Sequence, residues 1–146
     1  MLKIIETDLK PREPFEKRAT TKYIVLHHAE AVHCTIQDIN MWHKANGWSC
    51  CGYNYFVAKN GKIYRGRPEW AVGAQCKGFN SVSIGICAEG DYENKDKTMP
   101  KAQYDALVSL IHDIGTRYQN LEIKGHKELY PTECPGRFYP LEKLRK

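Results

Sequence analysis

Two histidines and one cysteine, His27, His126 and Cys134, are the side chains of this sequence best suited to bind a metal ion. His27 ends a short apolar run, where a chain leaves the core, and His126 follows a second such run and a glycine. Cys134 lies in a loop that Pro131 and Pro135 stiffen by fixing φ. Two imidazoles and a thiolate match the ligands that zinc prefers, and three protein ligands leave a fourth position for water. This layout is typical of a catalytic zinc.

Each of these residues also has a structural interpretation. A lone histidine at a strand end often only packs, and a cysteine beside prolines can be a small buried hydrophobe. His28 would point to the opposite face of the same strand as His27, so only one of the two can face a cleft. Because His27 and His126 are far apart in the sequence, no local motif contains both residues or predicts that they lie close together in space. Spacing alone leaves both interpretations open.

The elements that must position these residues follow from apolar periodicity. Residues 23–27 predict a buried strand. Thr35 and Asp38 predict a capped helix start, and the apolar spacing of Ile36, Ile39 and Trp42 predicts an amphipathic helix of about three turns. Gly47 supplies the signal that ends this helix.

A β-hairpin and a second helix follow. Runs at 53–58 and 62–65 flank Asn60-Gly61, a dipeptide that favours a type I′ turn because that turn needs positive φ at both central residues. Residues 82–88 predict another strand. The helix that opens at Pro100 carries its apolar residues at helical spacing. These are Tyr104, Leu107, Val108, Ile111, Ile114 and Tyr118.

A short strand at 121–124 and a last helical turn at 141–144 complete the predicted elements. Their order, β, α, β-hairpin, β, α, β, predicts an α/β fold with a central mixed sheet flanked by helices and a zinc cleft at the strand ends. The length of 146 residues fits a single domain, 1–146, and residues 1–21 are predicted to be an irregular lead-in.

Charge and composition narrow the class of partner. The 22 basic and 17 acidic residues give a net charge of +5, which suits an anionic polymer, but the basic residues are scattered and do not favour nucleic acid. No apolar run is long enough to span a membrane, and the lysine-broken N-terminus lacks a signal-peptide pattern, so we expect synthesis in the cytoplasm. The six cysteines include no Cys-x-x-Cys pair and are expected to be mostly free thiols.

Several short motifs occur in order over about residues 22–140. They are Leu26-His27-His28-Ala29, Trp42-His43-Lys44, Gly47-Trp48, Gly52-Tyr53-Asn54-Tyr55, Ser83-Ile84-Gly85-Ile86, Gly125-His126-Lys127-Glu128 and Thr132-Glu133-Cys134-Pro135-Gly136. Jointly they resemble the type-2 N-acetylmuramoyl-L-alanine amidases, which include phage lysozyme-type amidases and the animal peptidoglycan recognition proteins. The phage branch is the most similar.

The resemblance implies roles for five residues. The family's zinc ligands fall on His27, His126 and Cys134, with one Zn²⁺ per chain. Its active-site tyrosine falls on Tyr53. Thr132 occupies a site that is lysine in some phage enzymes, and a threonine hydroxyl there can donate a hydrogen bond to a developing oxyanion.

The chain also departs from the family pattern. Gln75 replaces a histidine of some relatives and cannot shuttle a proton, and Cys87 replaces a glutamate of others. The general base therefore stays unassigned, with Glu89 as a weak substitute. Three tryptophans are candidates to stack on sugar or peptide around the cleft, and the first is equally well explained as core. They are Trp42, Trp48 and Trp70.

The implied activity is hydrolysis of the amide bond between N-acetylmuramic acid and L-alanine of bacterial peptidoglycan. The implied protein is the catalytic domain of a phage or prophage endolysin, which acts on the wall after release by holin-type export or lysis. The alternatives are a peptidoglycan-binding module with weak or no catalysis, and a peptidase or other amidase on the same scaffold. Some non-catalytic recognition proteins lack the cysteine at Cys134, so its presence favours an enzyme.

Overall fold

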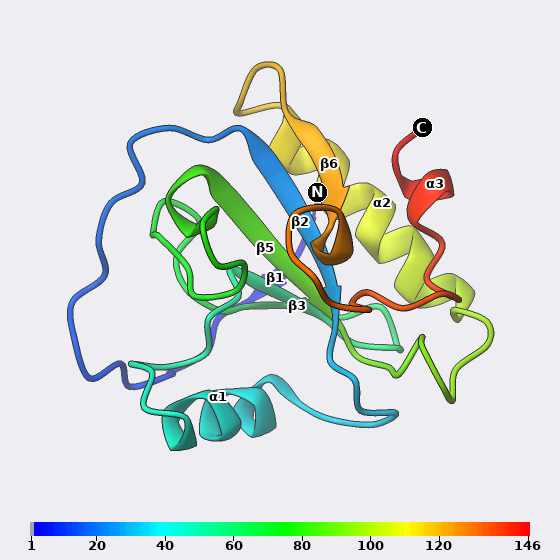
Figure 1. Cartoon of the computed structure of the whole chain (residues 1–146), viewed down its shortest axis with the longest axis horizontal. Coiled ribbons are helices and arrows are strands. Elements are labelled where there is room, and N and C mark those ends of the chain that lie inside the picture. Colours follow the sequence, from blue (N-terminus) through cyan, green and yellow to red (C-terminus); the bar gives the residue numbers. More distant parts are fainter. Residues whose placement is uncertain (1) are drawn as a thin grey trace.

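The computed structural model describes residues 2–146 and has a six-stranded mixed sheet with helices on both faces (Figure 1). The strands are β1 (Ile4–Ile5), β2 (Tyr23–His28), β3 (Tyr55–Val57), β4 (Ile63–Arg65), β5 (Ser83–Ala88) and β6 (Glu122–Gly125). The helices are α1 (Ile36–Ala45), α2 (Lys101–Gly115) and α3 (Leu141–Leu144), with 3₁₀ turns η1 (Asn80–Val82) and η2 (His126–Glu128). The predicted α/β fold class is confirmed.

The strand order explains how residues distant in sequence meet. The order is β1-β4-β3-β5-β2-β6, and every pairing is parallel except that of β3 with β4. The central strand β2 pairs with β5 and β6, so that His27 lies opposite Cys87 and Leu26 lies opposite Gly125. Because parallel strands finish at the same edge, the end of β2 and the start of η2 lie side by side.

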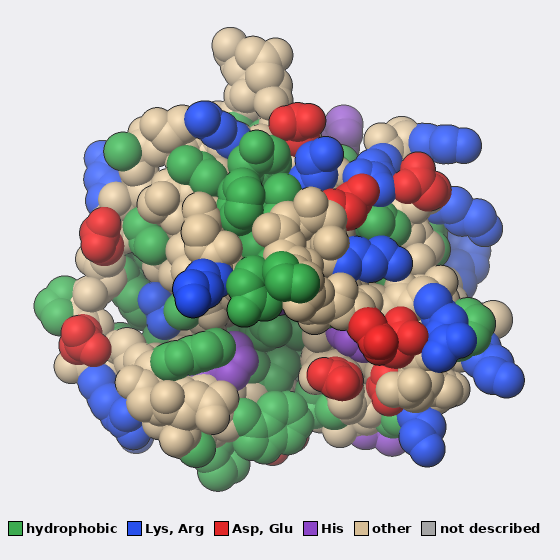
Figure 2. Space-filling view, viewed as in Figure 1, with side chains coloured by type: hydrophobic (Ala, Val, Ile, Leu, Met, Phe, Trp, Pro, Cys, Tyr) green, Lys and Arg blue, Asp and Glu red, His purple; other side chains and the backbone are tan. Residues whose placement is uncertain are grey.

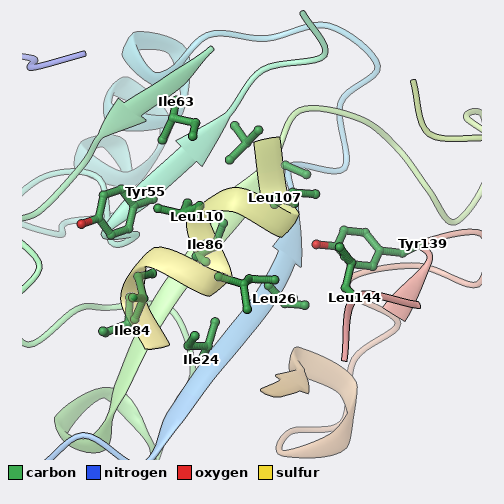
Figure 3. Packing of buried hydrophobic residues seen from close by; sticks show 14 of the residues in the cluster. Ile24, Leu26, Tyr55, Ile63, Ile84, Ile86, Leu107, Leu110, Tyr139 and Leu144 are labelled. Atoms are coloured by element: carbon green, nitrogen blue, oxygen red, sulfur yellow. The ribbon is translucent and has the colours of Figure 1, made fainter. Parts of the chain in front are cut away.

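The sheet has one face covered by α2 and another covered by α1, called here the α2 face and the α1 face. Side chains alternate between the two along each strand. Ile24 and Leu26 of β2 and Ile86 of β5 belong to the α2-face core, which Figure 3 shows packed beneath Leu107 and Leu110. On the α1 face, a smaller cluster joins strand residues to α1 and the segment before the hairpin. Its members include Ile36, Ile39, Cys50, Cys51, Phe56 and Cys87.

Helix α1 begins as predicted. The Thr35 side chain accepts from the Asp38 N–H and the Asp38 carboxylate accepts from the Thr35 N–H, a capping box. Ile36 and Ile39 are buried, but Trp42, predicted on the same apolar stripe, is 46% exposed. The buried part of α1 therefore ends at Ile39, about one turn before the end of the apolar pattern at Trp42.

Helix α2 is also confirmed, with a shifted buried face. Leu107, Ile111 and Ile114 are buried as predicted, but Val108 is 43% exposed. Gln103 is fully buried instead, and its amide donates to the carbonyls of Val57 and Glu89. A polar residue lies inward here because it pairs with carbonyls at the ends of two strands, which apolar periodicity does not reveal.

The hairpin turn differs from the prediction. Gly61 has φ of +90°, whereas Asn60 does not have positive φ, so the turn is not type I′. The Ala58 N–H donates to the Lys62 carbonyl and the Gly61 N–H donates to the Ala58 carbonyl. This pattern fits a type I turn followed by a left-handed glycine, which is also common in hairpins.

The lead-in is mostly irregular, as predicted, but Ile4–Ile5 form an edge strand that pairs in parallel with β4. Met1, the first residue of the predicted lead-in, lies outside the described residues. Among residues 2–146, no helix is both long enough and apolar enough to cross a membrane.

Candidate metal centre and its cleft

The three residues singled out as metal ligands meet at one edge of the sheet. His27 lies near the end of β2, His126 opens η2 and Cys134 lies in the loop that follows. One ligand atom from each side chain lies within 4.8 Å of the others. His27 is buried, while His126 and Cys134 are partly exposed, so the cluster is open on one side.

The distance between the donor atoms fits zinc. The His27 Nδ1 lies 3.5 Å from the Cys134 Sγ. In a tetrahedral site with Zn–S of about 2.3 Å and Zn–N of about 2.0–2.1 Å, sulfur and nitrogen are about 3.5 Å apart. The spacing of this pair therefore matches one edge of a zinc tetrahedron, and the two-nitrogen, one-sulfur donor set suits the same metal.

Backbone hydrogen bonds hold the Cys134 loop against η2. The Lys127 N–H donates to the Cys134 carbonyl at 2.8 Å, and the Gly136 N–H donates to the Glu133 carbonyl at 2.7 Å. Gly136 has φ of +103°, and a Cβ there would lie 2.3 Å from the carbonyl carbon of Tyr92. Only glycine allows this close approach, which seats the loop on the segment after β5.

Burial sets the protonation of the ligands in the metal-free protein. Burial lowers the pKa of His27 to about 3, with the neighbouring His126 adding to the effect, and burial also lowers the pKa of His126. Both imidazoles are therefore neutral at pH 7, as metal ligands must be. Burial raises the pKa of the Cys134 thiol to about 12, so this group loses a proton when a metal binds.

Tyr53 lies beside the metal ligands, two residues before β3 rather than on the strand. Its ring centroid is 4.9 Å from that of His27 and 5.4 Å from that of His43. Burial of its hydroxyl, reinforced by Cys87 and Cys134, raises the pKa of Tyr53 well above its ordinary value. The hydroxyl keeps its proton and remains a hydrogen-bond donor.

Thr132 lies in the ligand loop, two residues before Cys134. Its Oγ1 accepts a hydrogen bond from the Cys134 N–H at 3.3 Å. Because this bond uses only a lone pair, the hydroxyl hydrogen stays available to another acceptor. The side chain is partly exposed.

A cleft of about 460 Å³ opens beside the cluster. Figure 2 shows this hollowed face with histidine side chains at the edge of the hollow. Of the three tryptophans considered as stacking platforms, Trp48 lines the cleft, while Trp42 and Trp70 do not. Trp70 instead packs edge-on against Phe15. The lining residues are His43, Trp48, Tyr53, Ala74, Gln75, Cys76, Lys77, Asn80, His126 and Tyr130.

His43 is a cleft residue to which the sequence analysis gave no role, although it lies in a quoted motif. Its Nδ1 accepts from the Gly52 N–H at 2.9 Å, which leaves the hydrogen of the neutral ring on Nε2. Burial, with a contribution from Arg67, lowers the pKa of His43 to about 4. The cleft thus contains a third neutral imidazole, 4.5 Å from the Trp48 ring.

Glu89, weighed as a substitute general base, is engaged elsewhere. Its carboxylate accepts from the backbone N–H groups of Cys34 and Lys59, and it does not line the cleft. Its role is to hold two loops together. His28 points away from the metal cluster, as predicted, and its Nδ1 accepts from the Tyr92 N–H at 3.0 Å.

Comparison with known proteins identifies the family of this chain. The family model of the N-acetylmuramoyl-L-alanine amidases matches residues 17–137. The chain belongs to this family. The endolysin of Enterobacteria phage T3 is 33% identical over 128 residues, covering 84% of this chain and 85% of that protein. The endolysin of Escherichia phage T7 is 32% identical over 131 residues, covering 86% and 87%.

Amidases and recognition proteins share the fold. Peptidoglycan-recognition protein SC2 of Drosophila melanogaster is 33% identical over 126 residues, covering 78% of this chain and 67% of that protein. The solved structure of N-acetylmuramoyl-L-alanine amidase LysC from Clostridium intestinale URNW has a TM-score of 0.92 at 35% identity, covering 97% and 94%. The predicted family resemblance is confirmed.

Proposed function

We propose that this amidase family member is a zinc enzyme that hydrolyses the amide bond between the lactyl group of N-acetylmuramic acid and L-alanine of peptidoglycan. The observation that carries the proposal is the convergence of His27, His126 and Cys134 with the sulfur-to-nitrogen spacing of a zinc tetrahedron. We assign one Zn²⁺ per chain to these three residues. The proposed amidase domain covers residues 1–146.

The bound metal would act as a Lewis acid and lower the pKa of a coordinated water to about 7. The protein's part is to supply two neutral imidazoles and a thiolate in fixed positions. Because His27 lies near the end of a central strand and the Cys134 loop is tied to η2, these donors are fixed by the sheet and η2. Rigid placement of donors is what electrostatic catalysis requires.

Two hydroxyl groups are assigned to the acyl group undergoing attack. Tyr53 keeps its proton, lies against the His27 ring and lines the cleft, so it can donate to the carbonyl oxygen as negative charge develops. Thr132, with its hydrogen free and its oxygen tied to the Cys134 N–H, is a second donor. Both act only when charge develops, so their loss should lower kcat more than substrate binding.

The proposed substrate is bacterial peptidoglycan, and the proposed biological role is that of a phage or prophage endolysin. The phage relatives are endolysins, and a Drosophila recognition protein 25% identical to this chain has been solved with tracheal cytotoxin. A net charge of +5 suits approach to an anionic wall. We propose that the protein is made in the cytoplasm and reaches the wall after release.

A second candidate function, a peptidoglycan-recognition module without catalysis, is favoured by the recognition-protein relatives. The two functions predict different products from the same material. The protein, loaded with zinc, is incubated with purified cell walls, and new L-alanine amino groups and new reducing sugar ends are both measured. An amidase releases amino groups without reducing ends. Binding to the walls without released amino groups would favour the recognition module and contradict the proposal.

A further inference from the structure

We propose that Gln75 and Ser83 act as positioning residues that fix the tautomer of His27, so that its Nδ1 always presents a lone pair to the metal. The inference rests on the proposed zinc site, because the tautomer matters only if His27 binds a metal. Which ring nitrogen of His27 carries the hydrogen, called here the proton order, is set by the protein's own hydrogen bonds and can be tested without zinc. Neither residue is among the proposed ligands or hydroxyl donors.

The proton order follows from one chain of hydrogen bonds with a fixed end. The Ser83 hydroxyl donates to the Phe79 carbonyl at 2.7 Å, and a carbonyl can only accept. With its hydrogen used, the Ser83 oxygen accepts from the Gln75 Nε2 at 2.8 Å. This bond decides which end of the Gln75 amide is nitrogen and which is oxygen.

The amide oxygen of Gln75 consequently faces His27. The Gln75 Oε1 lies 2.5 Å from the His27 Nε2, and an amide oxygen can only accept, so this ring nitrogen carries the hydrogen. In a neutral imidazole the other nitrogen is then a bare acceptor. That nitrogen, Nδ1, is the atom 3.5 Å from the Cys134 Sγ.

The glutamine is held in place at both its backbone and its side chain. The Asn80 Oδ1 accepts from the N–H groups of Gln75 and Cys76 at 2.8 and 2.9 Å. The Gln75 side chain lies across Gly85 of β5, where a Cβ would be 2.6 Å from the Gln75 Cγ. A side chain larger than hydrogen at Gly85 would displace the amide. Gln75 is only 8% exposed, so water does not readily replace its hydrogen bonds.

The arrangement performs a task common to metal sites. A ligating histidine usually donates its second ring N–H to a fixed acceptor, and removing that acceptor lowers metal affinity by about 10–100-fold. Here the acceptor is a neutral amide whose own direction is set by Ser83 and Phe79. The tautomer of His27 is therefore set by residues two hydrogen bonds away from its ring, at the start of β5 and in the segment before it.

The first measurement is made on the metal-free protein by ¹⁵N NMR of the imidazole nitrogens. We expect His27 to be protonated on Nε2 in the wild type and in Gln75→Glu, because a carboxylate also accepts. Gln75→Leu removes the acceptor, and Ser83→Ala frees the amide to turn, so both should populate the Nδ1–H form. A wild-type His27 protonated on Nδ1 would overturn the inference, whether or not zinc binds.

The second measurement is zinc affinity by competition with a chelator. Gln75→Leu should weaken zinc binding by about 10–100-fold, Ser83→Ala should weaken it less, and Gln75→Glu should retain it. Gln103→Leu is the matched control, because it removes another buried glutamine amide on the α2 face and should leave zinc affinity unchanged. Wild-type affinity in both Gln75→Leu and Ser83→Ala would contradict the inference.

The two measurements separate this inference from the proposed function. If the wild type binds no zinc, the proposed function fails, while the proton order of His27 is still tested by NMR. Thermal unfolding of each variant shows whether it is folded. If Gln75→Leu does not fold, Ser83→Ala carries the test, since it removes only one hydroxyl.

Discussion

The α2 face and the α1 face of the same sheet use neighbouring residues for opposite purposes. His27 and His28 are adjacent on β2 and both are buried, yet His28 on the α2 face accepts a backbone N–H from Tyr92 and serves only the fold. His27 on the α1 face has one ring nitrogen beside a glutamine amide and the other beside a thiol. Position on the strand, and not residue type, separates the histidine that bonds to the backbone from the proposed metal ligand.

The two faces also differ in how they fill space. The α2 face is packed with large aliphatic side chains from strands and helix (Figure 3). On the α1 face, β5 presents Gly85 and Cys87, which are small enough to leave room for the Gln75 amide and the Tyr53 ring. We infer that stability is concentrated on one face and chemistry on the other. The following predictions test that division, from the largest expected effect to the smallest.

The largest effect is expected from Cys134→Ser. Serine offers zinc a neutral alcohol in place of a thiolate, so zinc and hydrolysis should both be lost, while the protein should still pellet with purified walls because the cleft remains. Cys87→Ser, a matched change on the α1 face at a residue that is not a proposed ligand, should keep its zinc. Retained hydrolysis in Cys134→Ser would mean that the zinc is not the catalyst.

Tyr53→Phe should lower turnover by roughly a hundred-fold, the usual scale for the loss of one transition-state hydrogen-bond donor, with zinc content unchanged. The matched control is Tyr55→Phe, which removes a hydroxyl bonded to Glu69 on the α2 face. Steady-state kinetics on soluble muropeptides would compare the two variants. Equal turnover in wild type and Tyr53→Phe would place Tyr53 among the structural aromatics.

These expectations show what the sequence could supply. Periodicity located the helices and every strand except the edge strand β1, which lies in the predicted irregular lead-in. The ligand types at His27, His126 and Cys134 indicated a metal, because two imidazoles and a thiolate form a donor set that zinc prefers. The burial of Gln103 was not predictable, since it depends on carbonyls from β3 and the segment after β5, and the apolar pattern did not mark Val108 as exposed. The link between Gln75 and His27 joins residues 48 positions apart and has no local signal.

Leu110→Ala tests whether the α2 face contributes to stability without affecting catalysis. Leu110 is fully buried on the α2 face, so its truncation should lower the free energy of unfolding by about 2–5 kcal/mol. Turnover per folded molecule should be unchanged at a temperature where the variant is folded. Chemical denaturation and zinc content would be measured together. Loss of zinc from the folded variant would show that the two faces are coupled.

The smallest effect is a change in bound protons. The pKa of the Cys134 thiol is about 12 without metal, and the pKa values of His27 and His126 are lowered, so only the thiol must deprotonate near neutral pH. Zinc affinity should therefore rise at least tenfold per pH unit between pH 6.5 and 8, with release of one proton per zinc from the thiol and of part of a second from the coordinated water, whose pKa would be about 7. Titration calorimetry in buffers of different ionisation enthalpy measures this number. Release of no proton would exclude a thiolate ligand.

The most direct test of the central claim is anomalous diffraction at the zinc edge from crystals of the zinc-loaded protein. We predict one zinc per chain at the edge of the sheet, bound by the His27 Nδ1, a nitrogen of His126 and the Cys134 Sγ. A metal bound to His28 or Cys87, or no metal at equimolar zinc, would contradict the assignment of chemistry to His27 and the α1 face.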